Sequence, residues 1–146
     1  MYDRILVPTD GSASAKKGAN HAIELAAALG ATIHALYVVD LPGAPRALAL
    51  RDDEEEMRER YREHGEETTR EVCDIAADAG VECVTAMKSG SIHEEITDYA
   101  EDEGIDVIVM GTAYRGQIGA FLGGEAEKVA RTSTVPVTTI RMRGNK

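Results

Sequence analysis

The sequence lacks a hydrophobic segment long enough to cross a membrane, and acidic residues outnumber basic ones. The apolar run near the N-terminus is too short for a signal peptide, and the richest apolar stretch, residues 21–39, is interrupted by Glu24, Gly30 and His34. There are 16 Lys and Arg against 26 Asp and Glu, so the formal net charge is −10. Nucleic acids and anionic lipids require a basic surface. We therefore expect a cytoplasmic protein that binds neither nucleic acid nor membranes.

Cysteine is scarce as well. Cys73 and Cys83 are the only two cysteines in the sequence, and they do not have the CxxC spacing of a redox motif. Disulfides are rare in the cytoplasm. We therefore expect two reduced thiols, half-buried in the fold.

Catalytic motifs are also missing. The segment His93–Thr97 begins like the helix of a zinc protease but has no second histidine at the required position. The chain has no GxSxG, GxxxxGK(S/T) or GxGxxG motif, and its four histidines lie on separate segments. We expect these histidines to be surface or packing residues. The sequence therefore predicts no metal site and no enzymatic activity, but a function in binding.

Length and charge set two further expectations. At 146 residues, the chain is predicted to form one domain that spans residues 1–146. It holds five lysines against eleven arginines among its basic residues. A lysine-poor acidic chain fits a salt-adapted cytoplasm, in which salt screens the repulsion between like charges. An acidic protein of an ordinary cytoplasm is the alternative.

Patterns typical of strands and helices alternate along the chain. Short apolar runs, as found in buried parallel strands, lie at residues 4–9, 31–40, 81–87, 106–111 and 136–142. Helical periodicity links them over residues 12–30, 52–80, 91–104 and 122–132. We expect Ser12 and Ser14 to cap the first helix, and Ser91–Glu94 has the spacing of a capping box. Leu41–Leu50 is predicted to be a loop with apolar residues that suit a lid or a packing flap.

This alternation predicts an α/β fold, with a single doubly wound domain and a parallel sheet that has helices on both faces. Ligands of such sheets bind beyond the C-terminal strand ends, where the strand order reverses. Two turns suit that crevice, PTDGS after the first strand and the glycine-rich GTAYRGQIGAFLGG after the fourth. A glycine-rich turn between a strand and a helix is a common phosphate site. The two turns together predict a site of nucleotide size.

Five segments carry a resemblance to a known family. They are ILVPTDGS (Ile5–Ser12), ALYVVD (Ala35–Asp40), SGSIHEEI (Ser89–Ile96), DVIVMGT (Asp106–Thr112) and GGEAEKVARTSTVPV (Gly123–Val137). In this order, and over nearly the whole chain, they resemble the universal stress protein family, the UspA-like domain. The resemblance implies a five-stranded parallel sheet in the order 3-2-1-4-5 and a homodimer, which we expect to form through the fifth strand, Pro136–Met142. It also implies a role in stress survival, with ATP or AMP bound in some members and no nucleotide in others.

The resemblance further implies where a nucleotide would lie. In members that bind one, the adenine and ribose lie near the turn after the first strand and the end of the second strand. The phosphates lie against a signature written G-x2-G-x9-G-(S/T). The site residues implied in this chain are Pro8, Thr9, Asp10, Val38, Met110, Gly111, Thr112, Arg115, Gly116, Gly123, Gly124 and Glu125.

The phosphate signature is altered in this chain. Gly111 matches its first glycine and Gly123 its last, whereas Tyr114 replaces the second glycine, the loop is one residue shorter, and Gly124 replaces the Ser/Thr. The tyrosine side chain fills space that a glycine leaves for phosphate, and the missing hydroxyl removes a hydrogen-bond donor. Glu125 suits the helix dipole, but its charge repels a triphosphate. We expect any binding of ATP or AMP to be weak.

Three functions remain open at this point. The first is a stress-response domain that acts by binding, with an adenine-nucleotide pocket whose phosphate loop is degraded. The second is a dimeric interaction module without nucleotide, which exposes an edge strand or the Leu41–Leu50 loop. The third is a weak nucleotide hydrolase, for which Asp10 is the only candidate base.

Overall fold

The computed structural model describes residues 2–40, 51–112 and 124–141, and the side chains of residues 51–54 are left aside. The predicted lid, Leu41–Leu50, lies outside these ranges. Strands and helices alternate through the described parts of the chain as expected. They are β1 (Arg4–Pro8), α1 (Ala13–Leu29), β2 (Thr32–Val39), α2 (Arg51–Asp78), β3 (Cys83–Ser89), α3 (Ile92–Asp102), β4 (Val107–Thr112), α4 (Glu125–Thr132) and β5 (Val137–Arg141).

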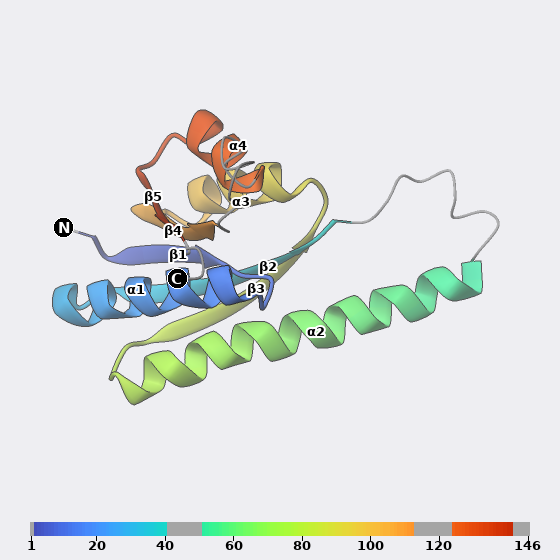
Figure 1. Cartoon of the computed structure of the whole chain (residues 1–146), viewed down its shortest axis with the longest axis horizontal. Helices are drawn as coiled ribbons and strands as arrows, with labels where there is room; N and C mark the ends of the chain where they lie inside the picture. Colours follow the sequence, from blue (N-terminus) through green and yellow to red (C-terminus); the bar gives the residue numbers. More distant parts are fainter. Residues whose placement is uncertain (1, 41–50, 113–123, 142–146) are drawn as a thin grey trace.

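The strands form one parallel sheet in the order β3-β2-β1-β4-β5 (Figure 1). β1 is the central strand, where Ile5 pairs with Ile33 of β2 on one side and with Val107 of β4 on the other. Leu6 and Val7 are fully buried because helices cover the sheet above and below. The predicted fold class and the strand order implied by the family resemblance are both confirmed.

Each face of the sheet carries two helices (Figure 1). α1 and α2 pack on one face around a core that includes Ile5, Val7 and Val109, and α3 and α4 pack on the other around Leu6 and Ile108. α1 begins as predicted, because the Oγ of Ser12 accepts a hydrogen bond from the backbone N–H of Ala15 at 3.2 Å. It also ends as predicted, with a glycine in the left-handed conformation at position 30 (φ +72°).

α2 packs on the sheet through its C-terminal half. Its buried residues, such as Thr68, Val72 and Ala76, all lie in that half, whereas residues 55–60 are exposed and the first turns extend past the sheet (Figure 1). Gly65 permits close packing on β2, because a Cβ at this position would lie 2.6 Å from Cδ2 of Tyr37. Gly65 therefore fixes which α2 residues come near the C-terminal end of β1.

The two cysteines form a disulfide, so the prediction of two reduced thiols is wrong. Cys73 lies in the last turns of α2 and Cys83 begins β3, and their Cα atoms are 5.2 Å apart. This separation lies within the usual range for disulfides. The chain turns back between α2 and β3, and the cysteine spacing in the sequence gives no sign of that approach.

Two helix starts differ from expectation. α4 begins at Glu125 rather than Leu122, because Gly124 has φ +57° and ψ −80°, which is not a helical conformation. Ser91 precedes α3, but its side chain makes no capping hydrogen bond to the helix, so the predicted capping box does not form. Its hydroxyl instead lies 3.4 Å from Nδ1 of His93. Within the described ranges, none of the helices is both long and apolar enough to cross a membrane.

Candidate functional site

A cleft of about 320 Å³ opens at the C-terminal end of the sheet. It lies where β1 and β4 run side by side and the chain leaves them toward opposite faces, which is the usual ligand site of a doubly wound sheet. Eight of the predicted site residues line it together. They are Pro8, Thr9, Asp10, Val38, Met110, Gly111, Thr112 and Glu125.

Of the four other predicted site residues, the structure describes only Gly124. Gly124 lies beside the cleft, as the residue before α4. Arg115, Gly116 and Gly123 lie outside the described residues, as does Tyr114. The part of the phosphate loop that the structure describes therefore consists of its two ends, at β4 and at α4.

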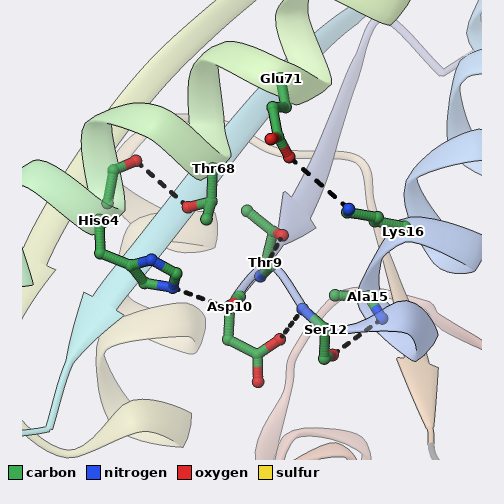
Figure 2. Close-up of polar contacts among 10 residues, drawn as sticks. Thr9, Asp10, Ser12, Ala15, Lys16, His64, Thr68 and Glu71 are labelled. Carbon is green, nitrogen blue, oxygen red and sulfur yellow. Dashed lines mark hydrogen bonds and ion pairs between the residues drawn. The ribbon is translucent and has the colours of Figure 1, made fainter.

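The turn after β1, residues 9–12, forms one wall of the cleft and is called the Asp10 turn below. The backbone N–H of Thr9 donates to the carbonyl of Leu36 in β2 at 2.9 Å, which joins the turn to the neighbouring strand. Within the turn, the N–H of Gly11 donates to Thr9 Oγ1 at 3.2 Å, and the N–H of Ser12 donates to Asp10 Oδ1 at 2.9 Å (Figure 2). Side chains of the turn thus satisfy its own backbone donors and fix its shape.

Gly111 at the end of β4 is required by packing, whatever the ligand. A Cβ on Gly111 would collide with the carbonyl oxygen of Ser14 in α1, and a Cβ on Gly18 would lie 2.6 Å from the backbone nitrogen of Gly111. The two glycines therefore let α1 approach β4 closely. The first glycine of the phosphate signature thus has a structural function in this chain.

The start of α4 forms another wall of the cleft, called the α4 wall below, and Glu125 is its charged residue. One carboxylate oxygen, Oε1, lies 3.7 Å from Nδ1 of His93 in α3, and Oε2 lies 3.7 Å from Nζ of Lys128. Both separations exceed hydrogen-bond length. Oε1 is buried, and it has no hydrogen-bond partner among the described residues. The α4 wall therefore places an unsatisfied carboxylate oxygen at the cleft.

The position of Glu125 bears on how the signature aligns. Counted from Gly111 without a gap, its last glycine falls on Gly124 and its Ser/Thr on Glu125. The left-handed φ of Gly124 favours glycine at this position, and Glu125 is the first residue of the helix. We therefore prefer this alignment, in which the loop has full length and a carboxylate replaces the hydroxyl.

The remaining wall of the cleft is largely apolar. This wall contains Leu36, Ile92 and Ile96, together with residues predicted from the sequence, and Ala126 adds an apolar side chain at the start of α4. The cleft therefore combines an apolar surface with hydroxyl and carboxylate groups, as sites for flat, partly polar small molecules do. In the described parts of the chain, no group of three or more His, Cys, Asp or Glu side chains is placed to hold a metal ion.

Sequence reasoning missed several residues at this site. His93 was expected to be a surface or packing residue, yet it faces Glu125. Ser14 was expected only to cap a helix, yet it lines the cleft and its hydroxyl lies 3.2 Å from that of Ser12. Ile92 and Ile96 were assigned to helix periodicity and to a segment of the family resemblance, but not to the site. Ile92 comes a few residues after the predicted strand 81–87. Because ligands bind beyond the C-terminal ends of parallel strands, this position was a signal that the start of α3 reaches the cleft.

The comparisons with known proteins agree on one family. Residues 1–141 match the Universal stress protein family. The Universal stress protein MJ0531 of Methanocaldococcus jannaschii is 34% identical over 142 residues, which cover 97% of this chain and 83% of the relative. The solved structure of MJ0577, a universal stress protein of the same organism, is 26% identical, covers 99% of each chain and has a TM-score of 0.81.

Two solved structures of more distant proteins contain nucleotides. A universal stress protein in complex with cAMP is 23% identical, with a TM-score of 0.71 over 95% of this chain and 97% of its own. A universal stress protein family protein of Arabidopsis thaliana with AMP bound is 18% identical, with a TM-score of 0.70 over 97% and 93%. These two show a shared fold, whereas the family match and the 34% relative show descent. The chain belongs to the universal stress protein family and is a stress-response domain.

Proposed function

We propose that this domain acts by binding an adenine nucleotide with few phosphates, and that it prefers AMP, cAMP or adenosine to ATP. The single observation that carries the proposal is the position of Glu125, whose carboxylate lines the cleft at the first residue of α4. The N-terminus of a helix is the usual place for a phosphate in this kind of site. A carboxylate at that place opposes each phosphate added to the ligand.

The repulsion between the Glu125 carboxylate and a phosphate is large enough to produce a preference for ligands with fewer phosphates. Two like charges 4 Å apart repel by about 1 kcal/mol in bulk water and about 4 kcal/mol near a protein surface. A tenfold change in affinity requires about 1.4 kcal/mol. Lys128 lies near the carboxylate and offsets part of its charge, but neither Lys128 nor His93 is within hydrogen-bond distance of it. The adenosine part of a ligand would contact the Asp10 turn and Val38, away from this charge.

The hydrogen bond that Asp10 makes within its own turn favours a role in binding over hydrolysis. This residue is the one carboxylate of the Asp10 turn, and its Oδ1 accepts a hydrogen bond from the N–H of Ser12. That bond closes the turn, so the carboxylate already has a structural function within it. We therefore treat Asp10 as a residue that shapes the turn.

The exposed edge of β5 supports a further part of the proposal, a homodimer. Pro136 directs its carbonyl toward β4, where it accepts a hydrogen bond from Ile108. Backbone groups alternate along a strand, so those of residues 137, 139 and 141 face away from β4. The carbonyl of Arg141 accepts a hydrogen bond from Nζ of Lys17 at 3.3 Å, so residues 137 and 139 form the part of the edge that is open to another strand. An unpaired edge is a template for another strand, and a two-fold copy closes the contact.

Denaturing mass spectrometry of the purified protein, followed by calorimetry with ATP, AMP, cAMP and adenosine, tests the nucleotide proposal. We expect AMP, cAMP or adenosine to be retained or to bind, each more tightly than ATP. Tightest binding of ATP would contradict the preference. Failure of all four ligands to bind would favour the interaction module without nucleotide, and turnover of ATP by the purified protein would favour the hydrolase.

Light scattering tests the dimer separately. We expect a dimer at micromolar concentration, and a shift toward monomer in Thr139→Pro, because proline removes a donor from the free edge of β5. Thr138→Pro is not a suitable control, because the N–H of Thr138 faces β4 and its loss would weaken the sheet itself. Lys128→Ala on α4 is a suitable control, because this exposed residue is not part of β5 and its loss should leave the dimer intact. A monomeric unmodified protein would exclude the dimer.

A further inference from the structure

α2 contacts the Asp10 turn through His64 and Thr68 (Figure 2), and neither residue lines the cleft. Nε2 of His64 lies 3.2 Å from the backbone carbonyl oxygen of Asp10. Cγ2 of Thr68 packs under Gly11, at 2.7 Å from the position that a Cβ would occupy there. One turn of α2 therefore supports the central peptide of the Asp10 turn.

We propose that His64 is a positioning residue for the cleft, which holds the peptide between Asp10 and Gly11 in the orientation that ligand binding requires. This inference rests on the proposed function only for its ligand, because the contact itself concerns the protein alone. His64 does not line the cleft and would act through Asp10.

The packing of α2 explains why His64 can reach the turn. Gly65, the next residue, lies where α2 comes close to Tyr37. The ring of Tyr37 in turn meets the His64 ring edge to face, with centroids 5.5 Å apart and planes at 77°. The imidazole is thereby oriented by β2 as well as by its own helix. Because a carbonyl oxygen only accepts, Nε2 must be the donor, and both the charged ring and one neutral tautomer carry that proton.

The Asp10–Gly11 peptide is a part of the turn that needs such support. Gly11 has φ +83°, and glycine permits conformations on either side of zero, so rotation of this peptide is not blocked by a side chain. Rotation would turn the Gly11 N–H away from Thr9 Oγ1, with which it now makes a hydrogen bond at 3.2 Å. His64 binds the carbonyl of the same peptide and so favours the present orientation.

The orientation of this peptide determines what the cleft presents. The carbonyl of Asp10 points to α2, while its carboxylate extends away from α2 (Figure 2). Oδ1 of that carboxylate is held by the N–H of Ser12 at 2.9 Å. A rotated peptide would move Thr9, Asp10 and Ser12, all of which line the cleft. His64 therefore contributes to affinity without touching the ligand.

Two variants separate the donor from the ring. His64→Phe keeps an aromatic ring beside Tyr37 but loses the donor, and His64→Gln keeps a donor at similar reach but loses the ring. Glu67→Ala, at an exposed residue of the same helix, is the control. Amide hydrogen exchange of Gly11 and Ser12 is measured by NMR on the full chain, together with AMP affinity by calorimetry and the melting temperature.

We expect His64→Phe to exchange the two amides faster and to bind AMP more weakly, each by roughly threefold to tenfold, the range that one net hydrogen bond supports. His64→Gln should recover most of both, and Glu67→Ala should match the unmodified protein. Unchanged exchange in His64→Phe, or equal losses in both His64 variants, would overturn the inference. If His64→Phe exchanges the two amides faster but the unmodified protein does not bind AMP, the contact is confirmed and the proposed ligand is contradicted.

Discussion

The Asp10 turn and the α4 wall border the same cleft, but they differ in how their polar groups are satisfied. In the Asp10 turn, hydroxyl, carboxylate and imidazole groups pair with the backbone, through contacts of 2.9–3.2 Å. At the α4 wall, Gly124 offers no side-chain cap, and Oε1 of Glu125 is buried without a hydrogen-bond partner in the described part of the chain. In the proposed function, the Asp10 turn would hold the adenosine part of the ligand, and the unsatisfied carboxylate of the α4 wall would disfavour additional phosphates.

The largest expected effect compares two glycines, one at each side of the cleft. Gly111→Ala should destabilise the protein by about 3 kcal/mol, because its Cβ would meet the carbonyl of Ser14, a backbone group that cannot rotate away. Gly124→Ala should cost about 1–3 kcal/mol, since its positive φ disfavours alanine while none of the described atoms lies within 4 Å of a Cβ there. Urea denaturation measures both. A larger loss for Gly124→Ala would contradict the account of close packing at Gly111.

The next effect compares two serines that precede helices at the cleft. Ser12→Ala should cost about 1 kcal/mol, because the Ser12 hydroxyl accepts from the N–H of Ala15. Ser91→Ala should cost less than about 0.5 kcal/mol, since the Ser91 side chain makes no capping bond. The same denaturation series measures the two losses. Equal costs would mean that the two helix starts do not differ as described.

Acid should weaken the attachment of α3, which carries part of the cleft. His34 of β2 is buried, and its Nδ1 lies 2.8 Å from the hydroxyl of Tyr99 in α3. Burial lowers the pKa of His34 below its ordinary value of 6.5, more than the nearby charge of Glu103 raises it. Folding therefore favours the neutral ring. The contribution of His34 to stability is complete above about pH 6.5, and it is lost as the pH falls through the lower pKa that His34 has in the folded state.

The melting temperature measured from about pH 8 down to pH 5 checks this expectation. We expect a decline below about pH 6.5, and a flatter curve for His34→Gln, which cannot titrate. Asp106 does not interfere, because the backbone N–H groups of Asp3 and Arg4 lower its pKa below the ordinary 3.8, so its loss comes at more acidic pH. Identical slopes for the variant and the unmodified protein would show that another group is responsible.

The smallest expected effect concerns salt. With a net charge of −10, the folded chain repels itself, and the Debye length falls from about 10 Å at 0.1 M to about 3 Å at 1 M. The melting temperature should therefore rise with potassium chloride over this range, and the preference for adenosine over ATP should narrow as Glu125 is screened. A flat melting curve would leave the salt-adaptation hypothesis without support.

The sequence predicted the fold more fully than the site. Apolar runs and helix signals such as Ser12 and Gly30 are local, so the elements and most of their limits could be read directly. The strand order came from the family resemblance rather than from any pattern of residues. The pairing of Cys73 with Cys83 depends on how α2 returns to β3, which no spacing reveals.

The contacts of the histidines could not be predicted for the same reason. His64 contacts the Asp10 turn because α2 packs beside that turn, and His93 faces Glu125 because α3 packs beside α4. Their neighbours in the sequence do not indicate either contact. The start of α4 was placed three residues early, because apolar periodicity continues into a segment where Gly124 is not helical. Glycine conformation and contacts between helices are properties of the folded chain.

The most direct test of the account is calorimetry of Glu125→Gln with ATP and with adenosine. Gly124→Ser would restore a hydroxyl at the phosphate signature, but the positive φ of residue 124 would strain a serine. The substitution is therefore made at Glu125. We expect ATP to bind about tenfold more tightly, because the repulsion removed lies between about 1 and 4 kcal/mol and a tenfold change needs about 1.4 kcal/mol. Adenosine should change by less than about twofold. The helix should at the same time lose about 0.3–1 kcal/mol of stability, because the carboxylate favours the α4 dipole. Equal changes for the two ligands, or no change for ATP, would contradict the claim that Glu125 sets the preference.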